Sequence, residues 1–205
     1  MNGAAGDPFA DLTAALGATE DASRDARLRL DPDRAARTGI PEFVLAERKS
    51  AEDVIASLTA LAARQGRALA SRVRPDQFAP LADGTTDPFT LELHAEACIA
   101  VVVHNNAPRK ARGGRIAVIA AGTSDRAVAT EAAIVAEEMG CAVHRIHDVG
   151  VAGLHRLVAP LREAMDQGVD AIVVAAGMDG ALPSVIAGLV PVPVIGLPVS
   201  VGYGY

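Results

Sequence analysis

Residues 115–128 read RIAVIAAGTSDRAV, and this stretch decides the fold. Ile116–Ala121 is a short, unbroken apolar run, which is typical of a strand buried on both faces of a parallel sheet. A helical pattern follows from Val128 to Met139 and ends at Gly140. The stretch therefore predicts a strand, a tight glycine-containing loop and a helix in direct succession.

The same alternation continues along the rest of the chain. Apolar runs predict strands at 142–146, 171–176 and 192–199, and helical patterns predict helices at 152–167 and 182–190. Strands that alternate with helices through short loops indicate a parallel sheet. The predicted fold class is α/β, with an open, mostly parallel sheet and helices on both faces, as in three-layer flavodoxin-like folds.

A smaller unit is expected before this core. Ser50 precedes a helical pattern that Gly66 closes, and Leu69–Val73 is predicted as a strand. A stretch rich in Pro, Asp and Gly (75–88) and the apolar run Cys98–Val103 follow. We expect a loosely ordered lead at 1–30, with one weak helix near Phe9–Leu16, and a small α/β module at 31–105. A polar linker at 106–112 and the core at 113–205 follow.

The composition limits the classes of function. The 205 residues carry 19 basic and 25 acidic side chains, a net charge of −6, which argues against a nucleic-acid coat or a polybasic membrane anchor. The N-terminus lacks the basic region of a secretory signal, and no window approaches the roughly 18 apolar residues of a membrane span. A soluble, cytoplasmic protein is expected. Cys98 and Cys141 lack zinc-site spacing and are predicted to be buried structural thiols.

In a sheet of this kind, ligands bind beyond the carboxyl ends of the strands, where helix N-termini direct N–H groups at anions. The four loops at that edge are 120–128, 147–156, 175–184 and 196–205, and all are rich in small residues. Glycine allows a backbone to approach a ligand closely. We therefore expect the ligand site in these loops.

Two of these loops carry a carboxylate beside glycines. Thr123 and Ser124 stand where a phosphate or carboxylate would dock, although Ser124 or Asp125 could equally serve as a helix cap. Asp125 and Asp179 follow neighbouring strands and could orient a ribose, hold a hydrated Mg²⁺ or move a proton. An aspartate beside glycine is more often a turn former, so Asp179 alone would be weak evidence.

Missing motifs narrow the chemistry further. The sequence has no G-x-G-x-x-G after the first core strand, no P-loop and no G-x-S-x-G elbow. The histidines do not cluster as metal ligands, since His144 and His147 fall on and just past one strand. His155 is the histidine best placed for acid–base or anion contact, and a solvent-facing or capping role suits it equally well.

Four segments, AGTSD, HDVGVAGLHRL, AAGMDGALPSVIAGL and PVIGLPVSVGYG, together resemble the LarB family, within the PurE-like AIR carboxylase superfamily. The segment LDPDRAARTGIPEFVLAERKSAEDV is similar to the N-terminal module of that family, so the resemblance covers most of 30–205. It implies a PurE-like core and an enzyme of nickel-pincer cofactor biosynthesis.

The implied reaction adds CO₂ to the pyridinium ring of nicotinic acid adenine dinucleotide and cleaves its phosphoanhydride, releasing AMP. A thiolate that adds to the ring makes an enamine-like carbon, which can capture CO₂. The expected partners are the dinucleotide and CO₂ or bicarbonate, with Mg²⁺ on the substrate phosphates, no tightly bound organic cofactor, no protein-held metal, no nucleic acid and no membrane. A homo-oligomer, from dimer to octamer, is also expected.

The loops and the resemblance together predict two sets of site residues. The predicted catalytic residues are Asp179, Asp125 and His155. The predicted substrate-binding residues are Gly122, Thr123, Ser124, Asp125, Asp148, Gly150, Gly177, Met178, Gly180 and Ser200.

The chain departs from the family pattern in two places. Asp179 stands where LarB-like sequences usually have Glu, which keeps the carboxylate but shortens its reach. The family's catalytic cysteine lies in a Ser-Cys-Ala helix beyond the V-G-Y-G segment, and this sequence ends at Tyr205, so a truncated form without the nucleophile is expected. An AIR carboxylase is an alternative, although His147-Asp148-Val149-Gly150 replaces its Ser-Ala-His-Arg motif. A nucleotide-binding module without chemistry is the other alternative.

Overall fold

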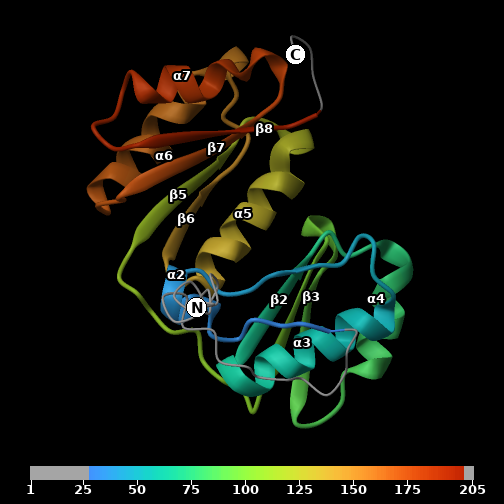
Figure 1. Ribbon diagram of the computed structural model, residues 1–205. Helices are drawn as coiled ribbons and strands as arrows, with labels where there is room; N and C mark the ends of the chain where they lie inside the picture. Colours follow the sequence, from blue (N-terminus) through green and yellow to red (C-terminus); the bar gives the residue numbers. More distant parts are fainter. Residues whose placement is uncertain (1–27, 201–205) are drawn as a thin grey trace, which may run out of the picture. The chain divides into compact units, whose positions relative to one another are not determined.

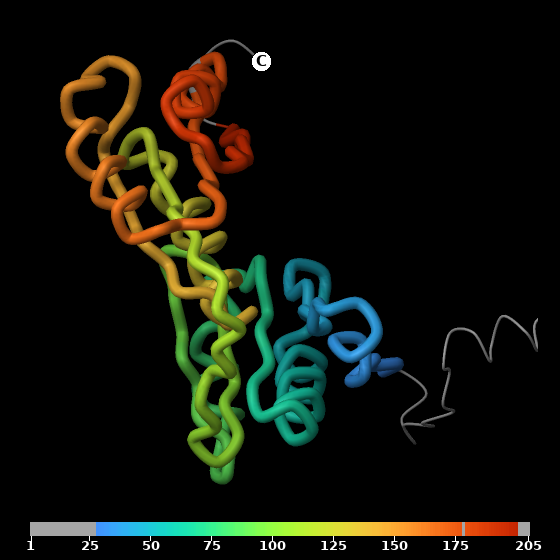
Figure 2. Tube along the Cα trace, turned by 90° about the vertical axis from the view of Figure 1, so that its left-hand side faces the viewer, coloured from blue at the N-terminus to red at the C-terminus, as the bar shows by residue number. Residues whose placement is uncertain are grey.

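The computed structural model describes residues 28–200, apart from the side chain of Met178. The weak helix expected near Phe9–Leu16 lies outside these residues. From Asp31 onward the described chain forms one compact unit, which contains two four-stranded sheets (Figure 1). Blue to green segments build the first sheet and yellow-green to red segments build the second, so each sheet uses a continuous part of the chain (Figure 2).

The first sheet is mixed, with the strand order β1-β2-β4-β3. β1 runs parallel to β2, whereas β4 is antiparallel to both of its neighbours. The elements in this part of the chain are α2 (Arg34–Thr38), β1 (Val44–Leu45), α3 (Ala51–Gln65), β2 (Arg67–Ser71), α4 (Pro75–Gly84), β3 (Phe89–His94), the 3₁₀ turn η1 (Ala95–Ala97) and β4 (Ile99–His104).

Local sequence explains the ends of α3. The hydroxyl of Ser50 accepts a hydrogen bond from the Asp53 N–H at 3.1 Å and caps the first turn. Gly66 ends the helix with a φ of +90°, a conformation that favours glycine. The helix therefore begins and ends where the sequence indicated.

The segment 75–88, rich in Pro, Asp and Gly, contains a helix that the sequence reasoning did not predict. Pro75 stands at the first helical position of α4, where the missing N–H costs no hydrogen bond. The Gln77 side chain accepts from the Arg74 N–H at 2.9 Å, which secures the start of this helix. β3 was also missed, and the strand expected at Leu69–Val73 lies at Arg67–Ser71.

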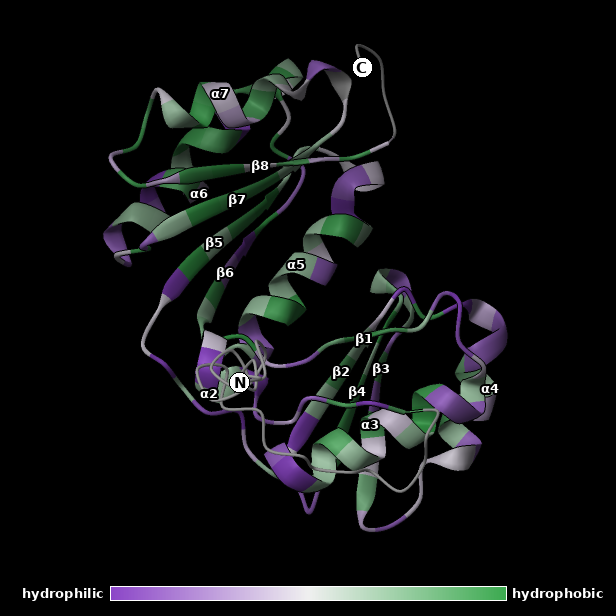
Figure 3. Ribbon diagram, viewed as in Figure 1, coloured by the Kyte–Doolittle hydropathy of each residue, from purple (hydrophilic) through white to green (hydrophobic). Residues whose placement is uncertain are grey.

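The second sheet is parallel throughout, with the order β6-β5-β7-β8, so the α/β fold class is confirmed. β5 and β7 are coloured hydrophobic along nearly all of their length, as strands covered on both faces are (Figure 3). The elements are β5 (Arg115–Ala120), η2 (Thr123–Asp125), α5 (Arg126–Glu138), β6 (Ala142–Ile146), η3 (Val151–Gly153), α6 (His155–Asp166), β7 (Ala171–Ala176), η4 (Met178–Gly180), α7 (Ala181–Ala187) and β8 (Val194–Pro198).

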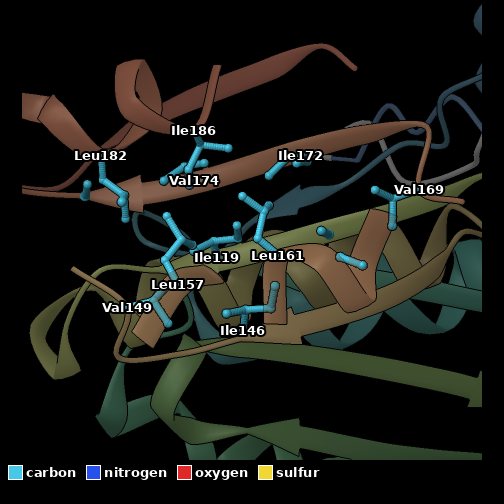
Figure 4. Packing of buried hydrophobic residues seen from close by; sticks show 13 residues of the cluster. Ile119, Ile146, Val149, Leu157, Leu161, Val169, Ile172, Val174, Leu182 and Ile186 are labelled. Atoms are coloured by element: carbon cyan, nitrogen blue, oxygen red, sulfur yellow. The ribbon is translucent and has the colours of Figure 1, made fainter. Parts of the chain in front are cut away.

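Helices pack on both faces of this sheet. Leu157 and Leu161 of α6, with Leu182 and Ile186 of α7, pack on one face against the strands (Figure 4). On the other face, Ala129 and Ala133 of α5 pack against Val118, Ala120 and Ala175. The small alanines let the helix approach the strands closely.

α5 also belongs to the core of the first sheet. Ile134, on its side facing away from the second sheet, packs with Leu69, Ile99, Val101 and Val103 of β2 and β4. Because side chains alternate along a strand, the buried Ala100 and Val102 face the opposite side of the first sheet. One helix thus completes two hydrophobic cores. No helix within residues 28–200 is long and apolar enough to cross a membrane.

Candidate functional site

The strand order reverses at the pair β5 and β7. The helix after β5 packs on one face of the sheet and the helix after β7 packs on the other. The connections that leave these two neighbouring strands therefore run to opposite faces and leave space between them. Parallel α/β sheets bind ligands at such a point, beyond the carboxyl ends of the strands. A cavity of about 260 Å³ opens here, lined by Ala121, Gly122, Ser124, Asp125, Gly150, Val151, Ala152, Ala176, Gly177 and Leu182.

Asp125 holds two sides of this cavity together. One carboxylate oxygen accepts from the Gly122 N–H at 2.8 Å, and the other accepts from the Gly177 N–H at 3.0 Å. The side chain is buried, with 4% of its residue surface exposed. Asp125 therefore ties the loop after β5 to the loop after β7, and both of its oxygens are engaged.

The Asp125 side chain does not cap α5. Asp125 is the N-cap residue of α5, yet its side chain makes no hydrogen bond to the first N–H groups of that helix. The carboxylate turns instead toward the loop that precedes it. α5 continues directly from η2, since the Arg126 N–H donates to the Thr123 carbonyl, so the positive end of the helix dipole lies at the start of η2 beside the cavity.

The third side of the cavity depends on glycine. A Cβ atom at Gly150 would lie 3.0 Å from the carbonyl oxygen of Ala121, which is closer than side chains normally approach a backbone. The loop after β6 therefore packs directly against the loop after β5 because residue 150 has no side chain.

Five of the predicted site residues line the cavity and the others do not. Those that line it are Gly122, Ser124, Asp125, Gly150 and Gly177. Thr123, Asp148, His155, Asp179, Gly180 and Ser200 lie outside the lining, and all except the half-buried Gly180 are exposed. The side chain of Met178 is outside the described residues. The predicted roles of all these residues stay predictions.

The loop after β7 has an unusual backbone. Asp179 and Gly180 both have a φ of +58°, the left-handed region. Such a conformation is uncommon for a residue with a side chain, although aspartate tolerates it better than most. It fits the turn-forming alternative raised for Asp179.

Apolar residues of the cavity were missed by sequence reasoning. Val151, Ala152 and Leu182 join Ala121 and Ala176 as lining residues. Their signal was the run of small and apolar residues around each glycine, which marks a loop but carries no chemistry of its own. The cavity is consequently less polar than the predicted residues implied.

Charged side chains stand near the cavity without lining it. Arg156 donates from Nη1 to the Asp148 carboxylate at 3.1 Å. Arg126, the first residue of α5, lies 3.4 Å from Glu96.

Partial burial lowers the pKa of His147, and the positive charges of Arg126 and Arg145 lower it further. His147 is therefore neutral at pH 7.

Neither cysteine lies at this cavity. Cys141 precedes β6, at the end of the strand opposite to the cavity, and Cys98 follows η1 in the first sheet. Both are partly buried, not fully buried as predicted, because each stands in a connection between elements and not inside a strand. Among residues 28–200, no group of three or more His, Cys, Asp or Glu side chains could hold a metal ion.

Comparison with known proteins assigns the two parts of the chain. Residues 22–104 match the family described as LarB/PurE-like N-terminal domain, and residues 115–203 match the AIR carboxylase family. The chain belongs to the LarB family, within the PurE-like superfamily. An uncharacterized protein from Methanocaldococcus jannaschii is 37% identical to it over 182 residues, covering 87% of this chain and 70% of the relative.

Membership of the LarB family agrees with the three-layer α/β core. It also supports a carboxylase-type function. The cavity at the strand ends of this LarB-family protein lies within the matched residues 115–203.

Proposed function

We propose that this LarB-family protein binds nicotinic acid adenine dinucleotide at the cavity between β5 and β7. It adds a carboxyl group from CO₂ to the pyridinium ring and cleaves the phosphoanhydride, releasing AMP. The observation that carries the proposal is the cavity itself, where loops from three parallel strands meet at the start of η2 and α5. The family's carboxylase-type function supports the reaction class.

The cavity offers two kinds of surface to such a ligand. The Ser124 hydroxyl suits a phosphate, because it is a donor near the start of η2 and α5, at the positive end of a helix dipole. Val151 and Leu182 offer apolar contact to a flat ring. The phosphates and the pyridinium ring of the dinucleotide would therefore contact different parts of the cavity lining.

Mg²⁺, if bound, would be held by the phosphates and not by this cavity. Asp125 is the one carboxylate among the described lining residues, and both of its oxygens accept backbone N–H groups. No reaction step is therefore assigned to a protein-held metal.

The thiol required for ring activation is not supplied by the described cavity residues. This observation favours a second candidate, a site that binds the dinucleotide without changing it. The two candidates share the same cavity and differ in whether products form.

Incubation with the dinucleotide, bicarbonate and Mg²⁺ tests the proposal. We expect AMP and a pyridinium mononucleotide that has gained one carboxyl group, detected by chromatography and mass spectrometry. Binding by calorimetry without either product would support the second candidate. Conversion of aminoimidazole ribonucleotide would contradict both candidates and indicate a purine-pathway carboxylase.

A further inference from the structure

Arg156 stands beside the cavity wall. It is the second residue of α6 and follows η3, whose residues Val151 and Ala152 line the cavity. Its Nη1 donates to Oδ2 of Asp148 at 3.1 Å, and the side chains are 45% and 64% exposed, respectively. An ion pair so open to solvent is weak, and a competing carboxylate can replace its acidic partner.

A glycine holds the guanidinium in this place. A Cβ atom at Gly153 would lie 2.7 Å from Nε, 2.8 Å from Nη2 and 3.1 Å from Cζ of Arg156. All three are atoms of the guanidinium group, so this planar group packs against the Gly153 backbone. Gly153 is itself buried. The guanidinium therefore lies against η3, the turn whose first two residues line the cavity.

Two arginines, Arg156 and Arg126, stand close to the cavity but outside its described lining. No cationic side chain lines it among the described residues, and the Asp125 carboxylate is fully engaged. A ligand with phosphates and a carboxylate needs a positive group within reach. Arg126 is the other nearby arginine, but it lies 3.4 Å from Glu96 with both side chains more than half exposed, and no glycine within residues 28–200 packs against it.

We propose that Arg156 is the specificity-determining residue that binds the ring carboxylate of the nicotinate group, in place of Asp148. This assignment rests on the proposed function. The phosphates have the Ser124 hydroxyl and the positive end of the helix dipole, whereas a planar carboxylate matches the paired N–H groups of a guanidinium. A carboxamide offers an NH₂ donor to the same guanidinium, so the site selects the acid over the amide.

Two dinucleotides that differ in this one group provide the test. Equilibrium binding of nicotinic acid adenine dinucleotide and nicotinamide adenine dinucleotide is measured for the wild type and for Arg156→Ala. We expect the wild type to prefer the acid at least about tenfold, and Arg156→Ala to remove the preference, since a site loses discrimination when its hydrogen-bonding group is removed. Arg156→Lys retains the positive charge but lacks the paired N–H groups of the guanidinium, so we expect it to keep part of the preference for the acid.

Two further variants separate position from charge. Arg162→Ala removes an exposed arginine from the same helix away from the cavity and leaves both affinities unchanged. Gly153→Ala keeps Arg156 but displaces its guanidinium, and reduces the preference in the same direction as Arg156→Ala. Circular dichroism melting verifies that each variant is folded.

The outcomes distinguish this inference from the function on which it rests. If the wild type binds neither dinucleotide, the proposed function is overturned, and this inference with it. If the wild type prefers the acid and Arg156→Ala keeps that preference, only the role of Arg156 is overturned. Equal weakening of both dinucleotides by Arg156→Ala would assign Arg156 to a phosphate and also overturn the inference.

Discussion

A single carboxylate organises the candidate site. Asp125 accepts N–H groups from the loops after β5 and β7, and it is buried while doing so. Sequence reasoning selected this residue for catalysis and substrate binding, with a helix cap as the alternative. The structure adds a different task, because a buried carboxylate that accepts two N–H groups keeps both loops in place.

Asp125→Asn tests this task. The amide keeps one oxygen but places an NH₂ group against a backbone N–H, so one buried donor loses its acceptor. We expect a loss of about 1–3 kcal/mol in the free energy of unfolding and weaker dinucleotide binding. Urea unfolding and calorimetry measure the two effects.

Asp179→Asn is the matched control for that variant. Asp179 is exposed and lies outside the cavity lining, so Asp179→Asn should change the free energy of unfolding of the protein little. Equal destabilisation by the two substitutions would show that Asp125 has no special role in holding the loops.

At the scale of elements, most of the second sheet follows from sequence patterns. The apolar run 171–176 placed β7 at its observed bounds, because a strand covered on both faces is apolar on both. The alternation of strands and helices placed β6 correctly, although it is an edge strand with an exposed Arg145. α4 and β3 were not found, since helix start signals lie inside a stretch rich in Pro and Gly. Close packing between two loops, as at Gly150, leaves no pattern that a single sequence reveals.

Gly150→Ala tests the contact between the loops after β5 and β6. Its Cβ would meet the Ala121 carbonyl oxygen at 3.0 Å, so one loop must shift. We expect a loss of about 1 kcal/mol in stability and a smaller cavity with weaker ligand binding. Thermal unfolding and calorimetry report these effects.

Gly188→Ala provides the comparison. Its Cβ would meet its nearest neighbour at 3.5 Å, an ordinary contact, and its φ of −75° suits any residue. If Gly150→Ala is as stable as Gly188→Ala, the close approach to the Ala121 carbonyl oxygen does not require glycine at position 150.

At the scale of the whole molecule, α5 connects the two sheets. It presents Ala129 and Ala133 to the second sheet and Ile134 to the first. The second core therefore depends on the first to cover an apolar side of its own helix. Cooperative unfolding of both sheets follows from this shared helix.

Ile134→Ala tests this coupling. Ile134 is 1% exposed, so truncation leaves a cavity and should cost about 2–5 kcal/mol. We expect both sheets to lose stability together, which hydrogen exchange of β4 and β7 amides can follow. Val158→Ala, at a side chain 52% exposed, should change little. Destabilisation confined to β4 amides would contradict the coupling.

A charged cluster reinforces the same junction. Glu138, at the end of α5, accepts hydrogen bonds from Arg67 at 2.8 and 2.9 Å and from Arg109 at 2.6 Å, and its side chain is 5% exposed. Burial opposes its ionisation, but the two arginines outweigh burial and hold the pKa of this carboxyl below its ordinary value of 4.5.

Glu138→Gln should therefore have a pH-dependent effect. A lowered folded-state pKa means that the stabilisation is fully present above pH 4.5 and is lost as pH falls through the folded-state pKa. We expect a loss of about 2 kcal/mol at pH 7, which shrinks in more acidic solution. Urea unfolding over a pH series measures this difference.

Glu137→Gln removes the neighbouring carboxylate, which pairs with Arg145 and is more exposed. Its effect should be smaller at every pH, because solvent screens that pair. A difference between wild type and Glu138→Gln that stays constant with pH would be inconsistent with the charged cluster.

The sequence by itself determined the α/β class, the parallel strands and the loops that carry the site. These features depend on local patterns, namely apolar runs, helix start and stop signals, and glycines beside polar residues. Tertiary structure alone decided which side chains share the cavity, that Asp125 bridges two loops, and that Arg156 packs on Gly153. These contacts depend on how strands order themselves in the sheet and how closely their loops approach, and neither is set by residues adjacent in the chain.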